Sequence, residues 1–432
     1  MMTRKKCNWW ILVLGCGVLI LALCLLYGWN KESMSRSNLS LPPKTRVVIH
    51  FSTSTTPNSY LHSKPQSQIF DYDNQGNILK NSIIDEEVVG PFIAKRNDSL
   101  AFLFKDHTVL ATTSQAKRLE SDSSIDFEAI NFGSSQSGYI DDLQLTYSLL
   151  NVGMLPNKPY TNVIRFISDT ESYDVEVPYY LEDIVYDQEQ KRMFCIIHNS
   201  ELDSNANIEL AYVIAKYDQD VGRFVLENEQ YVVVTSTPIN IHYRKSMIHE
   251  NKLYSIAYRD TLEYMSDPNP SKIRTCCDLV LCTYDLTTNK KLPEKILIDD
   301  FDLNQTGGDL LLSGSNQLPM CVVNNNLYAF LKTNEVWIVD KHGEIIKKDL
   351  PYIFQDTLNL KNPSDTASSV DFFSSEIKVN KDGDIYILIL YSDKIFRIHR
   401  LCDEGTYELV WEGSFPENVP KNMSVNDFEL IE

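Results

Sequence analysis

The chain has 432 residues, of which 43% are hydrophobic and 11% aromatic, so it carries enough apolar material for a packed core. Its 40 lysines and arginines stand against 59 aspartates and glutamates, which gives a net charge of −19. This acidic excess argues against nucleic acid as a partner, because phosphate binding needs a basic surface. It also disfavours flat binding on an anionic lipid surface.

The N-terminal 29 residues predict a membrane anchor. After Arg4, Lys5 and Lys6 comes an uncharged run of about 22 residues, which measures about 33 Å as a helix and can cross a bilayer core. Tryptophan and tyrosine residues flank this run, as in the aromatic belts of membrane helices. A cleaved signal peptide is the alternative, but its apolar core is usually shorter, at about 7–15 residues.

This anchor sets the expected order of segments along the chain. We expect a short basic cytoplasmic tail at residues 1–8, a transmembrane signal anchor at residues 9–29 and a flexible stalk at residues 30–44, which are rich in serine, asparagine, proline and charge. A folded domain is expected at residues 45–432. Basic residues occur on both sides of the anchor, so its orientation, with the domain outside the cytoplasm, rests on the shortness of the tail.

From Thr45 onward the periodicity is that of β-strands nearly throughout. Helical periodicity is scarce: the best candidate, residues 141–152, is short and lacks a C-terminal cap, so we interpret it as strand or loop. Three long polar segments are interpreted as loops between strands: residues 114–130, 260–274 and 302–318.

A repeating unit is clearest in residues 322–349. It contains two apolar strands, a turn and a half-polar strand, at residues 327–331, 336–339, 340–343 and 345–348. In the turn, Asp340 is expected to cap the backbone with its side chain, and Gly343 to supply the positive φ that closes a hairpin. The same Asp-x-x-Gly turn stands at residues 73–76. Further units follow at spacings of roughly 40–60 residues, at residues 99–113, 161–177, 191–234, 252–298 and 376–411.

Several of these strands are apolar on both faces, among them residues 194–197 and 385–391. A strand of an open sandwich would alternate apolar and polar residues, because one of its faces meets solvent. Sheets covered on both sides are typical of propeller blades packed between two neighbours. With about 385 residues after the stalk and units of about 45–55, we predict an all-β fold, a β-propeller of about seven four-stranded antiparallel blades, with six or eight left open.

Within this ring, residues 322–349 are expected to form the sixth blade. Propellers often close by mixing terminal strands in one sheet, so we expect residues 46–52 to pair with the blade that ends at residues 408–411. Radial repetition also explains how a chain longer than a usual single core forms one domain.

Three stretches resemble blade sequences of divergent bacterial β-propellers of the NHL, lactonase-like and quinoprotein-like kinds: VNKDGDIYIL (379–388), FRIHRLCDEGTYEL (396–409) and LVLCTYDLTTNKKL (279–292). The resemblance covers most of residues 45–432 and is carried by strand and turn patterns, so it implies the fold. Only Trp337 and Trp411 lie outside the anchor, so it does not imply a quinone cofactor. Lactonase-type propellers hold a divalent cation in the central channel, and that possibility stays open here.

No motif carries catalytic chemistry. His249-Glu250 opens like a zincin helix, but Leu253 stands where the second histidine is required, and a turn before a strand is expected. Residues 71–76 begin like a calcium loop, but Ser82 stands where a bidentate glutamate is required, so a hairpin turn is expected. We therefore assign no catalytic, cofactor-binding or metal-binding residue. Convergence of dispersed histidines at the channel stays open for His50, His62, His107, His198, His242, His249, His342 and His399.

The cysteines do not form a disulfide framework. Three lie in or beside the anchor: Cys7, Cys16 and Cys24. The domain holds six cysteines, which are too few for a disulfide framework in a domain of this length. We interpret them as buried free thiols and leave their redox state open. They are Cys195, Cys276, Cys277, Cys282, Cys321 and Cys402. The CCxxxxC stretch lacks a Cys-x-x-Cys pair and a nearby histidine, so a metal site is not expected there.

Two functions fit these features. The preferred one is a membrane-tethered extracytoplasmic binding or scaffolding module, a monomeric propeller that recognises a protein, peptide or glycan. The alternative is a metal-assisted hydrolase or lyase with its site at the central channel. Three or more carboxylates or imidazoles converging within about 5 Å would favour the enzyme. A large apolar patch on one rim would favour binding.

Overall fold

The computed structural model describes residues 39–431 with gaps. The segments outside the description are 54–66, 85–92, 97–98, 105, 123–132, 155–159, 199–207, 235–240, 261–275, 303–319, 331–334, 352, 354–358, 361–371, 374, 381, 404 and 420–422. The predicted tail, anchor and most of the stalk lie in residues 1–38, which are also outside it. Among the described residues, no helix is long and apolar enough to span a membrane.

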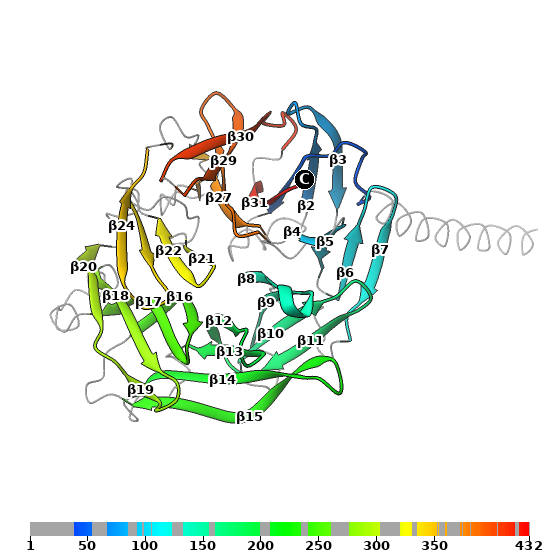
Figure 1. Ribbon diagram of the computed structural model, residues 1–432. Helices are drawn as coiled ribbons and strands as arrows, with labels where there is room; N and C mark the ends of the chain where they lie inside the picture. Colours follow the sequence, from blue (N-terminus) through cyan, green and yellow to red (C-terminus); the bar gives the residue numbers. More distant parts are fainter. Residues whose placement is uncertain are drawn as a thin grey trace, which may run out of the picture.

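Seven antiparallel sheets stand around a central axis as the blades of a propeller (Figure 1). The first blade contains β31 (Met423–Leu430), β1 (Val47–Thr53), β2 (Ser67–Tyr72) and β3 (Ile78–Ile84). The second contains β4 (Ile93–Arg96), β5 (Ser99–Leu103), β6 (His107–Ala111) and β7 (Ala116–Glu120). The third contains β8 (Gly133–Ile140), β9 (Leu145–Met154), β10 (Tyr160–Ile167) and β11 (Ser172–Val177).

The fourth blade contains β12 (Leu181–Asp187), β13 (Arg192–Ile197), β14 (Ile208–Asp218) and β15 (Arg223–Val234). The fifth contains β16 (Ile241–His249), β17 (Lys252–Asp260), β18 (Cys276–Asp285) and β19 (Lys290–Lys291), and β20 (Lys295–Asp302) also pairs with β18. The sixth contains β21 (Met320–Val323), β22 (Asn326–Phe330), β23 (Glu335–Val339) and β24 (Ile345–Asp349). The seventh contains β27 (Ser375–Val379), β28 (Ile385–Leu390), β29 (Ile395–Leu401) and β30 (Tyr407–Ser414).

Two small elements lie between these strands: the 3-10 helix η2 (Asp141–Leu143), and a two-stranded sheet of β25 (Asn359–Leu360) and β26 (Phe372–Phe373). The all-β propeller of seven blades and the place of residues 322–349 as the sixth blade are therefore confirmed. Of residues 141–152, which were expected to be strand or loop, residues 145–152 are strand, whereas Asp141–Leu143 form η2. The expected loop at residues 114–130 is wrong in part, because β7 occupies five of its residues and pairs with β6.

Ring closure uses a strand that the sequence analysis did not assign. The prediction that residues 46–52 pair with the strand ending near Trp411 is wrong, because β1 pairs with β2 and β31, whereas β30 is the outer strand of the seventh blade. The pairing runs from Val47 opposite Leu430 to Thr53 opposite Met423. As expected, however, the ring closes by pairing an N-terminal strand with a C-terminal strand in one sheet.

The core consists of hydrophobic clusters between neighbouring blades. Among the described residues there are seven such clusters, and each joins two adjacent blades. In β13, Met193 and Cys195 face the third blade, while Phe194 faces the fifth. This arrangement is the reason that the middle strands are apolar on both faces. Leu39 and Leu41, at the end of the predicted stalk, are buried between the first two blades.

The Asp-x-x-Gly turns form as the sequence predicts. Asp340 Oδ1 accepts hydrogen bonds from the backbone N–H groups of His342 and Glu344, at 2.9 and 2.8 Å, and Gly343 has φ +78°. The calcium-like segment is likewise a hairpin turn, in which Asp73 Oδ1 accepts two backbone N–H groups. At Gly76, with φ +77°, an added Cβ would meet the carbonyl oxygen of Glu412 in the seventh blade.

Candidate functional site

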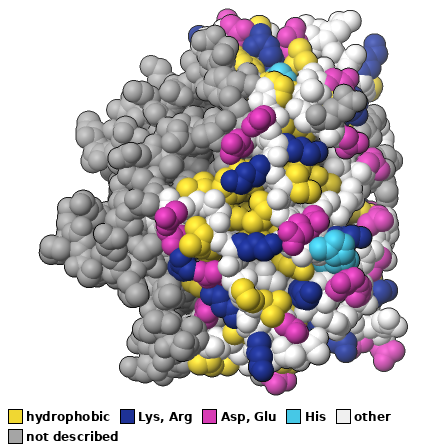
Figure 2. Space-filling model, turned by 60° about the vertical axis from the view of Figure 1, so that its left-hand side comes forward, with side chains coloured by type: hydrophobic (Ala, Val, Ile, Leu, Met, Phe, Trp, Pro, Cys, Tyr) yellow, Lys and Arg dark blue, Asp and Glu magenta, His cyan; other side chains and the backbone are white. Residues whose placement is uncertain are grey.

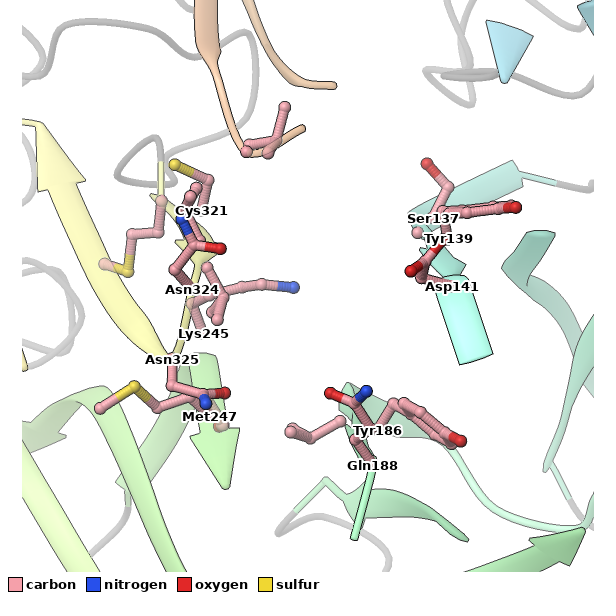
Figure 3. Close-up of a pocket in the computed structure, with 18 of the residues that line it drawn as sticks. Ser137, Tyr139, Asp141, Tyr186, Gln188, Lys245, Met247, Cys321, Asn324 and Asn325 are labelled. Atoms are coloured by element: carbon pink, nitrogen blue, oxygen red, sulfur yellow. The ribbon is translucent and has the colours of Figure 1, made fainter. Parts of the chain in front are cut away.

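A cavity of about 930 Å³ opens on the ring axis. Its walls come from the inner strands of six blades, β8, β12, β16, β21, β27 and β31. In Figure 3, Ser137, Tyr139 and Asp141 lie on one side of the opening and Lys245 and Asn324 on the other, with the Lys245 ammonium group directed into the space between them. The innermost strands of six of the seven blades therefore contribute to a shared pocket.

Tight turns after the inner strands set polar groups on the cavity rim. Asn324 and Asn325 join β21 to β22 with φ values of 49° and 58°, and Glu250 and Asn251 join β16 to β17 with φ values of 49° and 57°. Asparagine tolerates this left-handed conformation because its short side chain hydrogen-bonds locally. Asn324, Asn325 and Glu250 line the cavity as a result. His249 and Glu250 form the end of a strand and a turn, as expected.

The two lysines that line the cavity each lie close to a buried carboxylate. Lys245 Nζ lies 3.6 Å from Asp183 Oδ1, and Lys378 Nζ lies 2.9 Å from Asp427 Oδ2 and 3.4 Å from Glu429 Oε2. Burial lowers the pKa of Lys378, but the two carboxylates outweigh it and raise that pKa above its ordinary value. Burial raises the pKa of Asp183, and Lys245 opposes this effect.

Carboxylates without a basic partner lie on the rim of the same cavity. Asp141 and Glu189 are exposed, and within the described part of the chain neither forms an ion pair with a lysine or arginine. Glu250 lies 3.7 Å from His249. Among the described residues of this opening, the lysines thus lie beside carboxylates, whereas Asp141 and Glu189 have no lysine or arginine partner.

Among the residues that the structure describes, exposed apolar side chains do not gather on one rim. The large hydrophobic side chains that are exposed lie mostly on outer strands of different blades, among them Ile83, Val225, Ile296, Ile346 and Leu409. Figure 2 shows hydrophobic, basic and acidic side chains interspersed over one face of the described surface. Scattered exposed apolar residues of this kind are normal for a soluble surface.

Among the described histidines, His50, His107 and His399 have separate surroundings, whereas the rings of His249 and His342 lie 6.2 Å apart. His50 is buried against Ser67, and burial lowers its pKa to about 3. His107 stacks on Phe104, His399 contacts Tyr391, and His249 lines the cavity. His62 lies outside the described residues.

His198 and His242 come together with Glu182, a residue that the sequence analysis did not single out. Glu182 Oε1 lies 3.5 Å from His198 Nε2 and 3.4 Å from His242 Nδ1. One donor atom from each of the three lies within 4.8 Å of the others, so they could hold a metal ion. The position of Glu182 and His242 near the starts of β12 and β16 was the available signal, but strand adjacency between blades is not visible in the sequence.

A second cluster, Glu209, Cys282 and Glu294, has the proximity of a metal site but not its chemistry. Lys291 binds both Glu209 and Glu294, and Arg259 also pairs with Glu294. Both carboxylates are thus already paired with basic side chains, and burial raises the pKa of the Cys282 thiol to about 11. This cluster is a buried ion-pair network.

The cysteines of the described domain are free thiols, as expected, and four of them are buried: Cys195, Cys277, Cys282 and Cys321. Cys402 is half-buried and also free. Burial raises the pKa of Cys195 and of Cys321 to about 12, which makes both thiols unreactive. The side chain of Cys276 lies outside the description.

The chain matches no protein-family model and no curated protein sequence. Its solved structural neighbours are propellers of low identity. A hypothetical selenium-binding protein from Sulfolobus tokodaii has a TM-score of 0.45 at 11% identity, covering 91% of this chain and 96% of that one. Apo AztD from Citrobacter koseri has a TM-score of 0.36 at 10% identity, covering 89% and 97%. The dihydro-heme d1 dehydrogenase NirN, in complex with DHE, has a TM-score of 0.40 at 10% identity, covering 90% and 67%. The seven-bladed ring itself confirms the predicted resemblance to propellers at the level of the fold.

Proposed function

We propose that this propeller is a binding module whose partner inserts a basic group into the axial cavity. The observation that supports it is the charge pattern of the opening: both wall lysines lie beside buried carboxylates, while Asp141 and Glu189 on the rim have no lysine or arginine partner in the part of the chain that the structure describes. Complementary charge of this kind guides a partner and fixes its register more than it adds affinity. A protein or peptide segment bearing lysine or arginine is the occupant that fits.

The polar groups around the cavity also suit a peptide. Tyr139 and Tyr186 offer rings whose hydroxyl groups donate to Gln144 and Asp142 and can accept a further hydrogen bond. Gln188, Asn324 and Asn325 offer amides that can pair with backbone groups. A cavity of about 930 Å³ accommodates a few side chains and not a whole domain. The expected contact is therefore one short segment of a larger partner.

The test is binding of the full chain to three labelled probes: a lysine-rich peptide, a glutamate-rich peptide of equal length, and a neutral oligosaccharide. We expect binding of the basic peptide alone, weakened by salt. The double variant Asp141→Asn/Glu189→Gln is expected to weaken it about 2- to 30-fold, because two exposed ion pairs at about 0.2–1 kcal/mol each contribute about 0.4–2 kcal/mol together. The control Asp220→Asn removes an exposed carboxylate from the β14–β15 turn and is expected to change nothing. Binding of the oligosaccharide alone would contradict a peptide partner.

We also propose that residues 9–29 tether the propeller to a membrane, with the domain outside the cytoplasm. The support is the apolar run with its flanking aromatic residues and short basic tail. Protease added to intact cells is expected to digest the domain. Protection in intact cells, with digestion after lysis, would place the domain in the cytoplasm.

A metal-assisted hydrolase or lyase is the second candidate function. The observation that favours it is the convergence of Glu182, His198 and His242, since three converging donors are what such an enzyme needs. These residues do not line the axial cavity, however. Hydrolysis of a model ester that a chelator abolishes and zinc restores would support this candidate over the binding module.

A further inference from the structure

We propose that Glu182, His198 and His242 form a binding site for a divalent transition metal, with Zn²⁺ as the expected ion, at the junction of the fourth and fifth blades. This site is separate from the axial cavity and does not depend on the proposed peptide partner.

The fold brings the three residues together from distant parts of the sequence. Glu182 is the second residue of β12, and His242 is the second residue of β16, the inner strand of the next blade. His198 follows directly after β13, which pairs with β12 so that Leu181 lies opposite Ile197. Cavity-lining Asp187 is five residues beyond Glu182, or about 17 Å along the strand. The cluster therefore lies toward the other end of these inner strands from the acidic rim.

The spacing of the donor atoms is that of metal ligands. Glu182 Oε1 is 3.5 Å from His198 Nε2 and 3.4 Å from His242 Nδ1. A strong hydrogen bond between a carboxylate and an imidazolium would be shorter, at about 2.7–2.9 Å. Two donors that each lie about 2.0–2.1 Å from a tetrahedral zinc ion are about 3.3 Å apart. The distance from Glu182 Oε1 to each imidazole nitrogen is therefore close to the distance between two ligands of one zinc ion.

The surrounding contacts hold the ligands in place. The other oxygen of Glu182, Oε2, accepts the backbone N–H of Tyr243 at 2.7 Å, which fixes the carboxylate with Oε1 toward the imidazoles. The His198 ring packs against Tyr180 at a centroid distance of 4.7 Å and lies 5.6 Å from the His242 ring. Outer contacts of this type orient metal ligands and support affinity.

The solvent exposure of the cluster suits a metal ion that keeps one coordination position free for water or a partner group. The Glu182 side chain is 5% exposed, while those of His198 and His242 are 22% and 35% exposed, so the carboxylate is buried and the imidazoles reach the surface. Nitrogen and oxygen donors select zinc and similar ions over calcium, which takes oxygen ligands only. Three protein ligands leave the fourth zinc position for water or for a partner group.

The experiment measures metal binding by the full chain after removal of metal with a chelator. Titration with Zn²⁺, and with Co²⁺ followed by its visible absorption, is expected to show one saturable site per chain. Glu182→Gln, His198→Ala and His242→Ala are each expected to weaken binding at least about tenfold, because loss of an outer contact alone costs 10–100-fold. The control His342→Ala removes an exposed imidazole from a turn and is expected to bind as the wild type does.

Glu182→Gln keeps an acceptor for the Tyr243 N–H, so a folded variant is expected, which the melting curve of the metal-free protein checks. Absence of saturable Zn²⁺ binding in the wild type would overturn the proposal. Unchanged affinity in folded Glu182→Gln and in the two histidine variants would also overturn it, and would place the metal elsewhere in the chain.

Discussion

At the scale of single residues, Asp71 is a buried carboxylic acid whose burial disfavours its charged form. It lies in β2, is 3% exposed, and its Oδ1 has no hydrogen-bond partner among the described residues. Burial raises the pKa of Asp71 to about 7, and Lys80, opposite it in β3, opposes this rise. The folded state therefore holds this proton more tightly than the unfolded chain, in which the pKa is about 3.9.

This shift predicts a pH dependence of stability. Because the folded pKa lies above the unfolded one, the contribution of Asp71 is complete below about pH 4 and is lost as the pH rises to about 7, by at most about 4 kcal/mol. Denaturant unfolding at a series of pH values is expected to show that Asp71→Asn removes this decline. Asp220→Asn, at an exposed turn, is expected to retain it, and an equal slope in wild type and Asp71→Asn would contradict the assignment.

At the scale of the strand, position within the blade decides how much a side chain contributes. Ile387 in β28 is fully buried in the cluster between the sixth and seventh blades, whereas Ile346 in the outer strand β24 is 44% exposed. We expect Ile387→Ala to lower the free energy of unfolding by about 2–5 kcal/mol. Ile346→Ala, the same chemical change, is expected to cost less than about 1 kcal/mol. Similar losses in urea unfolding would argue against the inter-blade core.

The strands that the sequence predicted well are the ones that this core buries. Residues 385–391 and 194–197 are apolar on both faces because each face meets a neighbouring blade, and that pattern is visible without a structure. The sequence pattern did not predict the closing strand β31, because a bulge interrupts its alternation of buried and exposed residues. His50 pairs with Asp427 and Phe51 with Val425, so Asn426 is the extra residue of a bulge that separates the buried positions. β7 has a single buried residue, so its sequence shows too few apolar positions to be distinguished from a loop.

At the scale of the whole molecule, the ring explains why the sites were harder to predict than the fold. The number of blades follows from repeat length, a property of each unit. The axial cavity takes residues from six blades, and the Glu182 cluster takes them from two. Their meeting depends on how blades stand beside each other, which the spacing of residues along the chain does not encode.

The pairing of β1 with β31 also determines when this protein can finish folding. β1 is synthesised before every other strand of the ring, and β31 after all of them. During all of that synthesis one edge of β1 has no partner, and an open strand edge is a template for wrong pairing. A nascent chain of this design therefore carries an open strand edge, and with it an aggregation hazard, at β1 until β31 has been synthesised.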